Sequence, residues 1–291
     1  MATNSREQKA PVKNFNEKSG AGSETQTPVM NKAQILSALK RQMPARGNGG
    51  EVKTIDDVIL TPTKNQRNMI RVMEEKPIVL VEGVFGTGKT IWACEAALRS
   101  VIEKKSTRIC INAPAVTAGE DIGFLKGTLE DKMLPHVNQI LEAFDEFIGE
   151  DLRKNMVTAG IIKIEPHAFL RGRSLRNTFF IFDECQNASG PNLKTAITRL
   201  GEGSTFVFMG DNAQNDRTTQ QNSAYRKFVE VFTKPVYNAY VGHARLTVDD
   251  VKRHPFLKLM VENGDDAPLE GYETHKGPSG SPSRPNFPRP V

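Results

Sequence analysis

The residues with the clearest chemistry form one glycine-rich segment that starts at residue 83 and ends at residue 90. This segment matches the pattern GxxxxGK followed by Ser or Thr, and it consists of Gly83, Val84, Phe85, Gly86, Thr87, Gly88, Lys89 and Thr90. The glycines let backbone N–H groups curl around phosphates, and a helix that follows adds the positive end of its dipole. Lys89 would then reach the β- and γ-phosphates, and the Thr90 hydroxyl would ligate Mg²⁺. We therefore predict a nucleoside-triphosphate site with a bound Mg²⁺.

A second candidate is the acidic pair Asp183 and Glu184, which directly follows an apolar run that ends at Phe182. Adjacent acids are common on protein surfaces, but acids that end a fully apolar strand downstream of a phosphate-binding loop are much less so. We predict that Asp183 holds Mg²⁺ through its water shell. Glu184 would polarise a water molecule, as a general base, for in-line attack on the γ-phosphate.

The apolar run 205–209 is followed by a glycine and then by Asp211 and Gln214. Gln214 is placed to contact the γ-phosphate or the attacking water and so to report hydrolysis. Asp211 has an alternative role, because an aspartate at this position can simply cap a turn.

Gln66 is the candidate for recognition of the base, because it follows the segment Thr61-Pro-Thr-Lys-Asn65 and precedes an expected helix. Its amide carries a donor and an acceptor, which can pair with the edge of adenine and favour ATP over GTP. The guanine-specific motif NKxD does not occur in the chain. Without the phosphate-binding loop nearby in sequence, Gln66 would be an ordinary exposed residue.

The elements that must position these residues alternate between strands and helices. Apolar runs predict strands at 77–81, 107–111, 161–164, 178–182, 205–209 and 236–241, and helical spacing predicts helices at 67–74, 89–104, 127–148 and 192–200. This alternation indicates an α/β fold with three layers and a doubly wound, mostly parallel sheet. Ligands of such sheets bind at the carboxyl ends of the strands, which is where the candidate residues fall.

Composition divides the 291 residues into a core and two polar tails. Residues 1–50 and 263–291 carry little apolar surface, so we expect disordered tails around a core domain at 51–262. The net charge of +5 belongs to the first tail, where eight Lys and Arg face three acids. That tail could contact phosphate polymers, or it could serve only solubility. Residues 32–43 have weak helical periodicity, which favours a fraying helix over a docking segment.

Cys94, Cys110 and Cys185 lie far apart and form no CxxC pair, so we expect buried thiols in a reducing compartment. No apolar run approaches the length of a membrane span, and the N-terminus has no signal-peptide core. These observations predict a cytoplasmic protein without a membrane partner.

Taken together, these residues resemble the PhoH-like proteins, P-loop ATPases related to the first RecA-like domain of superfamily 1 helicases. Beyond the glycine-rich loop, the resemblance rests on Pro114-Ala-Val-Thr-Ala-Gly-Glu-Asp-Ile-Gly-Phe-Leu125, Phe169-Leu-Arg-Gly-Arg-Ser174, Asp183-Glu-Cys-Gln-Asn187, Gly210-Asp-Asn-Ala-Gln214 and Asp250-Val-Lys-Arg-His-Pro255. It covers about residues 61–261. One departure is Ala113, which stands where the family usually has an arginine.

The resemblance implies a RecA-like fold, ATP and Mg²⁺ as ligands, ATP hydrolysis, and RNA or single-stranded DNA as the target. It also implies that Arg253 senses the γ-phosphate. The short core and the low-complexity tails are similar to those of a phage or compact bacterial member.

A single RecA-like core leaves the γ-phosphate open to water, whereas superfamily 1 helicases close this site with a second domain. A homo-oligomeric ring, with six subunits as the common number, would supply the missing cation from a neighbour. Arg171, Arg173 and Arg199 are the candidates for this role or for contact with a nucleic-acid backbone. The alternative for each of them, as for Arg253, is a surface salt bridge.

These features favour an ATPase that couples hydrolysis to action on RNA or single-stranded DNA. Two alternatives stay open: an ATP-switched regulatory or binding module, and an ATPase accessory to a separate ribonuclease. Aromatic residues that could stack on bases are few, with one Trp and four Tyr and no interleaving with basic residues, which weakens the helicase hypothesis.

Overall fold

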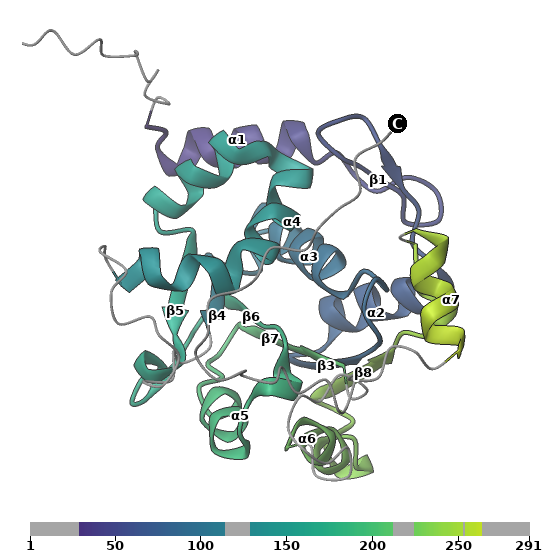
Figure 1. Ribbon diagram of the computed structural model, residues 1–291. Helices are drawn as coiled ribbons and strands as arrows, with labels where there is room; N and C mark the ends of the chain where they lie inside the picture. The colour runs from purple at the N-terminus through teal and green to yellow at the C-terminus, as the bar shows by residue number, and fades with distance from the viewer. Residues whose placement is uncertain (1–28, 114–128, 212–223, 253, 264–291) are drawn as a thin grey trace, which may run out of the picture.

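The computed structural model describes residues 29–113, 129–211, 224–252 and 254–263. Its centre is a six-stranded sheet in the order β5-β4-β6-β7-β3-β8, in which every neighbouring pair is parallel. The strands are β3 (Ile78–Glu82), β4 (Arg108–Ala113), β5 (Ile162–Pro166), β6 (Thr178–Phe182), β7 (Thr205–Gly210) and β8 (Val241–Arg245). Figure 1 shows β5 at one side of this sheet and β8 at the other. The predicted α/β fold with a parallel, doubly wound sheet is confirmed.

Helices cover both faces of the sheet, which gives the three expected layers (Figure 1). On one face lie α1 (Lys32–Gln42), α2 (Lys64–Glu75), α3 (Lys89–Ile102) and α4 (Leu129–Thr158), and on the other lie α5 (Gly190–Ile197) and α6 (Ala224–Phe232). Because β6 is covered on both faces, all five of its side chains are buried, as its apolar sequence predicts. The second face is packed with aromatic rings, among them Phe180, Phe206 and Phe208.

Shorter elements complete the fold. A two-stranded antiparallel sheet joins β1 (Val52–Lys53) to β2 (Ile59–Leu60), and α7 (Pro255–Asn263) ends the described chain. The 3₁₀ turns are η1 (His167–Leu170), η2 (Cys185–Asn187), η4 (Pro235–Tyr237) and η5 (Val248–Asp250).

Most predicted boundaries are within three residues of the observed ones, but two elements differ by more. The strand expected at 236–241 is instead the turn η4, which Pro235 starts, and the strand itself is β8 five residues later. The helix expected at 127–148 continues to Thr158, with a break at Gly149, whose φ is 71°. In both places the local apolar pattern was present, but the segments that pack against the element determine where it begins and ends.

The segment before residue 51 corrects the expected boundary between tail and core. Residues 32–42 form α1, which begins with a capping box between Asn31 and Gln34. The side chains of Ile35 and Leu39 are fully buried against the core. The disordered tail predicted for residues 1–50 is therefore wrong for α1, because a weakly amphipathic helix gains its stability from the surface that it covers.

A buried ion-pair network fastens this segment to the core. Arg46 donates from Nε to Oε1 of Glu95 on α3 at 3.0 Å, and it also pairs with Glu74 at the end of α2. Glu95 is fully buried and pairs with Arg99 as well, so its charge is compensated from two sides. Arg46 thus joins the chain after α1 to two helices that flank the phosphate-binding loop.

We expect Leu39→Ala to lower the free energy of unfolding by about 2–5 kcal/mol, because it leaves a cavity under α1. For a domain of this size that corresponds to a fall of about 5–15 °C in Tm. Lys40→Ala is the matched control, because Lys40 is exposed on the same helix. Equal melting temperatures for the two variants would show that α1 does not contribute to core stability.

Two other expectations concern the described residues. All three cysteines are buried, as predicted, and burial raises the pKa of each thiol. Within the described ranges, no helix combines the length and the apolar character needed to span a bilayer.

Candidate active site

The predicted phosphate-binding loop connects the end of β3 to the start of α3. Gly88 is the N-cap of α3 and has a φ of 81°, a backbone conformation that only glycine adopts readily. No side chain among the described residues caps this helix, so the cap leaves the first-turn N–H groups for a ligand. Such N–H groups and the positive end of the helix dipole together make a site for an anion such as phosphate.

Lys89 lies across this loop. Its Nζ donates hydrogen bonds to the carbonyl oxygens of Gly83 at 2.6 Å and of Val84 at 2.9 Å. The ammonium group is therefore held inside the loop, where phosphate oxygens would be better acceptors than neutral carbonyls.

The two predicted Mg²⁺ ligands are in direct contact. Thr90 Oγ1 donates to Oδ2 of Asp183 at 2.7 Å, although the residues are 93 positions apart in sequence. Burial and the charge of Glu184 raise the pKa of Asp183, whereas hydrogen bonds from Thr90 and from the Glu184 backbone N–H act in the opposite direction. A hydroxyl and a carboxylate side by side at the end of the phosphate-binding loop fit Mg²⁺, which prefers oxygen ligands.

Glu184 has an unusual backbone conformation, with a φ of 52° and a ψ of 38°. In this left-handed conformation the Glu184 carboxylate accepts a hydrogen bond from Nε2 of Gln186. Gln186 is 3% exposed, and its Oε1 accepts the backbone N–H of Asp211 at 2.9 Å. Gln186 therefore links the candidate general base to the residue that follows β7.

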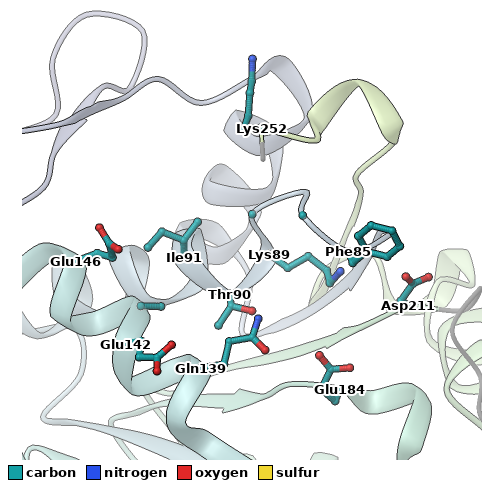
Figure 2. A pocket seen from close by; sticks show the side chains of 13 residues that line it. Phe85, Lys89, Thr90, Ile91, Gln139, Glu142, Glu146, Glu184, Asp211 and Lys252 are labelled. Atoms are coloured by element: carbon teal, nitrogen blue, oxygen red, sulfur yellow. The ribbon is translucent and has the colours of Figure 1, made fainter. Parts of the chain in front are cut away.

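Lys89, Thr90, Glu184 and Asp211 line one cavity of about 510 Å³, and Asp183 is joined to it by its hydrogen bond with Thr90. Figure 2 shows Lys89 and Thr90 at its centre, with Glu184 and Asp211 on one side and Gln139, Glu142 and Glu146 of α4 on the other. Phe85 of the loop and Lys252 also line it. The loop, the strand ends and α4 thus form a pocket of a size that suits a nucleotide.

Comparison with known proteins agrees with this geometry. A family model described as "PhoH-like protein" matches residues 58–263. The chain belongs to the PhoH-like family. It is 33% identical to a PhoH-like protein of Synechocystis sp. over 79% of this chain and 68% of that protein. It is also 33% identical to a PhoH-like protein of Mycobacterium tuberculosis (83% and 69%) and 32% identical to protein PhoH of Escherichia coli (67% and 55%).

Among solved structures, the chain is similar to the large terminase of a thermophilic bacteriophage. The TM-score is 0.43 with 11% sequence identity, over 70% of this chain and 50% of the terminase chain. A similarity this weak carries no argument about function.

In this PhoH-like chain, Gln66 lies beneath the phosphate-binding loop. It is 2% exposed, and its Nε2 donates to the Thr87 carbonyl at 2.9 Å, while its Oε1 accepts the Thr63 N–H of the capping box of α2. Gln66 therefore supports the loop from below. Its role in reading adenine stays a prediction.

The other predicted residues separate into two groups. Gln214 and Arg253 lie outside the described residues. Arg171, Arg173 and Arg199 are described, and none of them lines the cavity. Arg173 pairs with Glu165 at 2.8 Å, and Arg199 donates to Thr198 at 3.1 Å.

Sequence reasoning missed two features of this site. Gln186 and the acidic wall of α4, formed by Glu142 and Glu146, were not among the predicted residues. The position of Gln186 in the sequence was a usable signal. It follows Glu184 by two residues, so its side chain can lie at the same end of β6 as the Glu184 carboxylate. Nothing near Glu142 in the sequence marks it as part of the cavity.

Proposed function

We propose that this PhoH-like chain hydrolyses ATP in a Mg²⁺-dependent reaction and couples hydrolysis to binding of single-stranded RNA or DNA. The observation that carries the proposal is that Lys89, Thr90 and Glu184 line one cavity and that Asp183 is hydrogen-bonded to Thr90 there. Chain segments more than 90 residues apart supply a phosphate ligand, two oxygen ligands for a cation and a carboxylate base.

The side chains divide the work of hydrolysis. Lys89 exchanges its two carbonyl acceptors for phosphate oxygens and so neutralises charge on the nucleotide. Glu184 accepts a proton from the water that attacks the γ-phosphorus, while the bond to the bridging oxygen of ADP breaks. Thr90 and Asp183 would hold Mg²⁺, which would supply positive charge against the phosphate oxygens.

Coupling to a second ligand needs a physical link from the hydrolysis site, and Gln186 supplies one. Its amide contacts the Glu184 carboxylate on one side and the Asp211 N–H on the other. A displacement of Asp211 would therefore shift the base, and ATP binding would in turn bias the position of Asp211.

The proposal includes a ring of identical subunits, with six favoured. Its support is that none of Arg171, Arg173 and Arg199 lines the cavity of its own chain, as expected if one of them completes the site of a neighbour. A second candidate function, an ATP-switched binding module with slow turnover, is favoured by one observation. Glu184 and Lys89 both make hydrogen bonds with protein groups, and these contacts would have to exchange before hydrolysis.

Steady-state ATPase assays with a panel of oligonucleotides test the proposed function. We expect single-stranded RNA or DNA to raise kcat several-fold, and we expect the rate to rise more steeply than linearly with protein concentration near the assembly threshold. Double-stranded DNA of the same length is the control for simple charge effects.

A slow basal rate that no oligonucleotide changes would favour the ATP-switched module. Full activity of a protein that sedimentation shows to be monomeric would contradict the ring.

A further inference from the structure

The connection between β5 and β6 exposes an aromatic ring among positive charges. Phe169 is 55% exposed, and Arg171 and Arg173 are exposed beside it in sequence. The whole segment 166–176 contains no acidic residue. We call residues 169–173 the arginine turn. The sequence suggested no interleaving of aromatic and basic residues, but the fold buries Leu170 and exposes the residues on either side of it, Phe169 and Arg171.

The arginine turn is held in one conformation. Arg171 has a φ of −62° and a ψ of 136°, Gly172 has a φ of 74°, and the Arg173 N–H donates to the Leu170 carbonyl. These are the angles of a type II turn, whose third position favours glycine. Leu170 is fully buried below the turn, and Arg173 is braced by its ion pair with Glu165. A ligand would therefore meet a preformed surface and would lose little free energy in ordering it.

The two arginines have different roles. Arg173 is engaged by Glu165, whereas Arg171 makes no ion pair or side-chain hydrogen bond with the part of the chain that the structure describes. The Arg171 charge lies close enough to His167 to lower the pKa of that imidazole, together with burial. Arg171 is thus an available cation whose guanidinium can bind a phosphate in a bidentate manner.

A donor at the base of the turn also lacks an acceptor. Asn112, at the carboxyl end of β4, is 3% exposed, and its Oδ1 lies 3.3 Å from His167 Nδ1. Its Nδ2 has no hydrogen-bond partner among the described residues. A buried donor without a partner costs free energy, so an acceptor from a ligand would be favoured there.

We propose that the arginine turn is a contact site for single-stranded nucleic acid, with a base stacked on Phe169 and a backbone phosphate held by Arg171. This inference rests on the proposed function and locates its second ligand. An arginine that completes a neighbour's nucleotide site needs no exposed aromatic ring, whereas bases stack on such rings without regard to sequence. A protein partner for an apolar ring would not require two arginines on the same turn, one of which makes no ion pair with the described residues.

The position in the sheet suits this role. The turn follows β5 and Glu184 follows β6, so both come after strands that run in the same direction, with only β4 between them in the described sheet. A single-stranded nucleic acid bound at the turn would therefore lie at the carboxyl ends of the β-strands, where the nucleotide cavity also lies, on the side of the sheet away from β8 (Figure 1).

Fluorescence anisotropy with labelled oligouridine and oligothymidine, on the full chain, tests the inference. We expect Phe169→Ala to weaken binding about tenfold, since stacking contributes about 1–3 kcal/mol per base. Arg171→Ala should weaken it several-fold and reduce the salt slope by about 0.7, the value for one phosphate contact of a single strand. Phe169→Trp should restore binding, and the two oligonucleotides show whether RNA or DNA is preferred.

The matched controls are Tyr240→Ala and Arg41→Ala, which remove another exposed ring and another exposed cation far from the turn. If the wild type binds and the Phe169 and Arg171 variants bind equally well, the site is wrong and the proposed function stands. If the wild type binds neither oligonucleotide, the nucleic-acid part of the proposed function fails together with this inference. If Arg171→Ala loses ATP hydrolysis without nucleic acid and keeps its affinity for the oligonucleotide, Arg171 acts on a nucleotide, which overturns the inference.

Discussion

Glu184→Gln should bind ATP almost as the wild type does and should lower kcat by about 10²-fold or more. Glutamine has nearly the same shape as glutamate but cannot accept a proton from the attacking water. The phosphate ligands of the loop are untouched, so the loss falls on the transition state and not on binding. The measurements are a steady-state kcat and a separate dissociation constant for a non-hydrolysable ATP analogue. Turnover close to the wild type's would remove Glu184 from the mechanism.

Gln186→Ala should lower kcat less than Glu184→Gln does, and so serves as a comparison for that variant. It leaves the base in place but removes the amide that holds the Glu184 carboxylate and receives the Asp211 N–H. Loss of one hydrogen bond to a charged group corresponds to about a tenfold fall in kcat. We expect unchanged KM and a smaller effect than in Glu184→Gln. An unchanged kcat would show that Gln186 only packs the strand end.

Lys89→Ala should lower the affinity for ATP by about 10²-fold or more, because the charged hydrogen bonds to the phosphates are lost. Removal of the side chain also releases the carbonyls of Gly83 and Val84, which Lys89 holds in this structure. Titration calorimetry with the non-hydrolysable analogue gives the affinity directly.

Lys252→Ala is the matched control for Lys89→Ala, because Lys252 lines the same cavity, lies apart from Lys89 in Figure 2 and is not part of the phosphate-binding loop. We expect less than a tenfold loss there. Equal losses in the two variants would mean that general positive charge, and not the position of Lys89, holds the nucleotide.

Much of the hydrolysis site could be predicted from the sequence because its parts are contiguous. The loop from Gly83 to Thr90 carries its ligands and its helix start within eight residues, and Asp183 and Glu184 end a strand that is apolar at every central position. The parallel sheet then brings these strand ends together by its topology alone. Thr90 and Asp183 are in contact for this reason.

The helix α1 shows where local reasoning fails. Its sequence has weak periodicity and polar neighbours, and a helix of this length is only marginally stable in isolation. Its order comes from Ile35 and Leu39, buried against α3 and α4, and from Arg46, whose partner Glu95 lies 49 residues away. None of these partners can be identified before the fold is known.

By itself, the sequence determined the nucleotide loop, the acidic strand end, the order of strands and helices, and the family to which they belong. Only the tertiary structure decided that Gln66 supports the loop from below, that Gln186 joins Glu184 to Asp211, and that α4 closes the cavity with Glu142 and Glu146. It also decided that Phe169 is exposed beside Arg171 while Leu170 is buried. The physical reason is that a motif consists of residues close together in the sequence, so it can be identified without the fold. Burial and side-chain hydrogen bonds depend on which distant segments pack together.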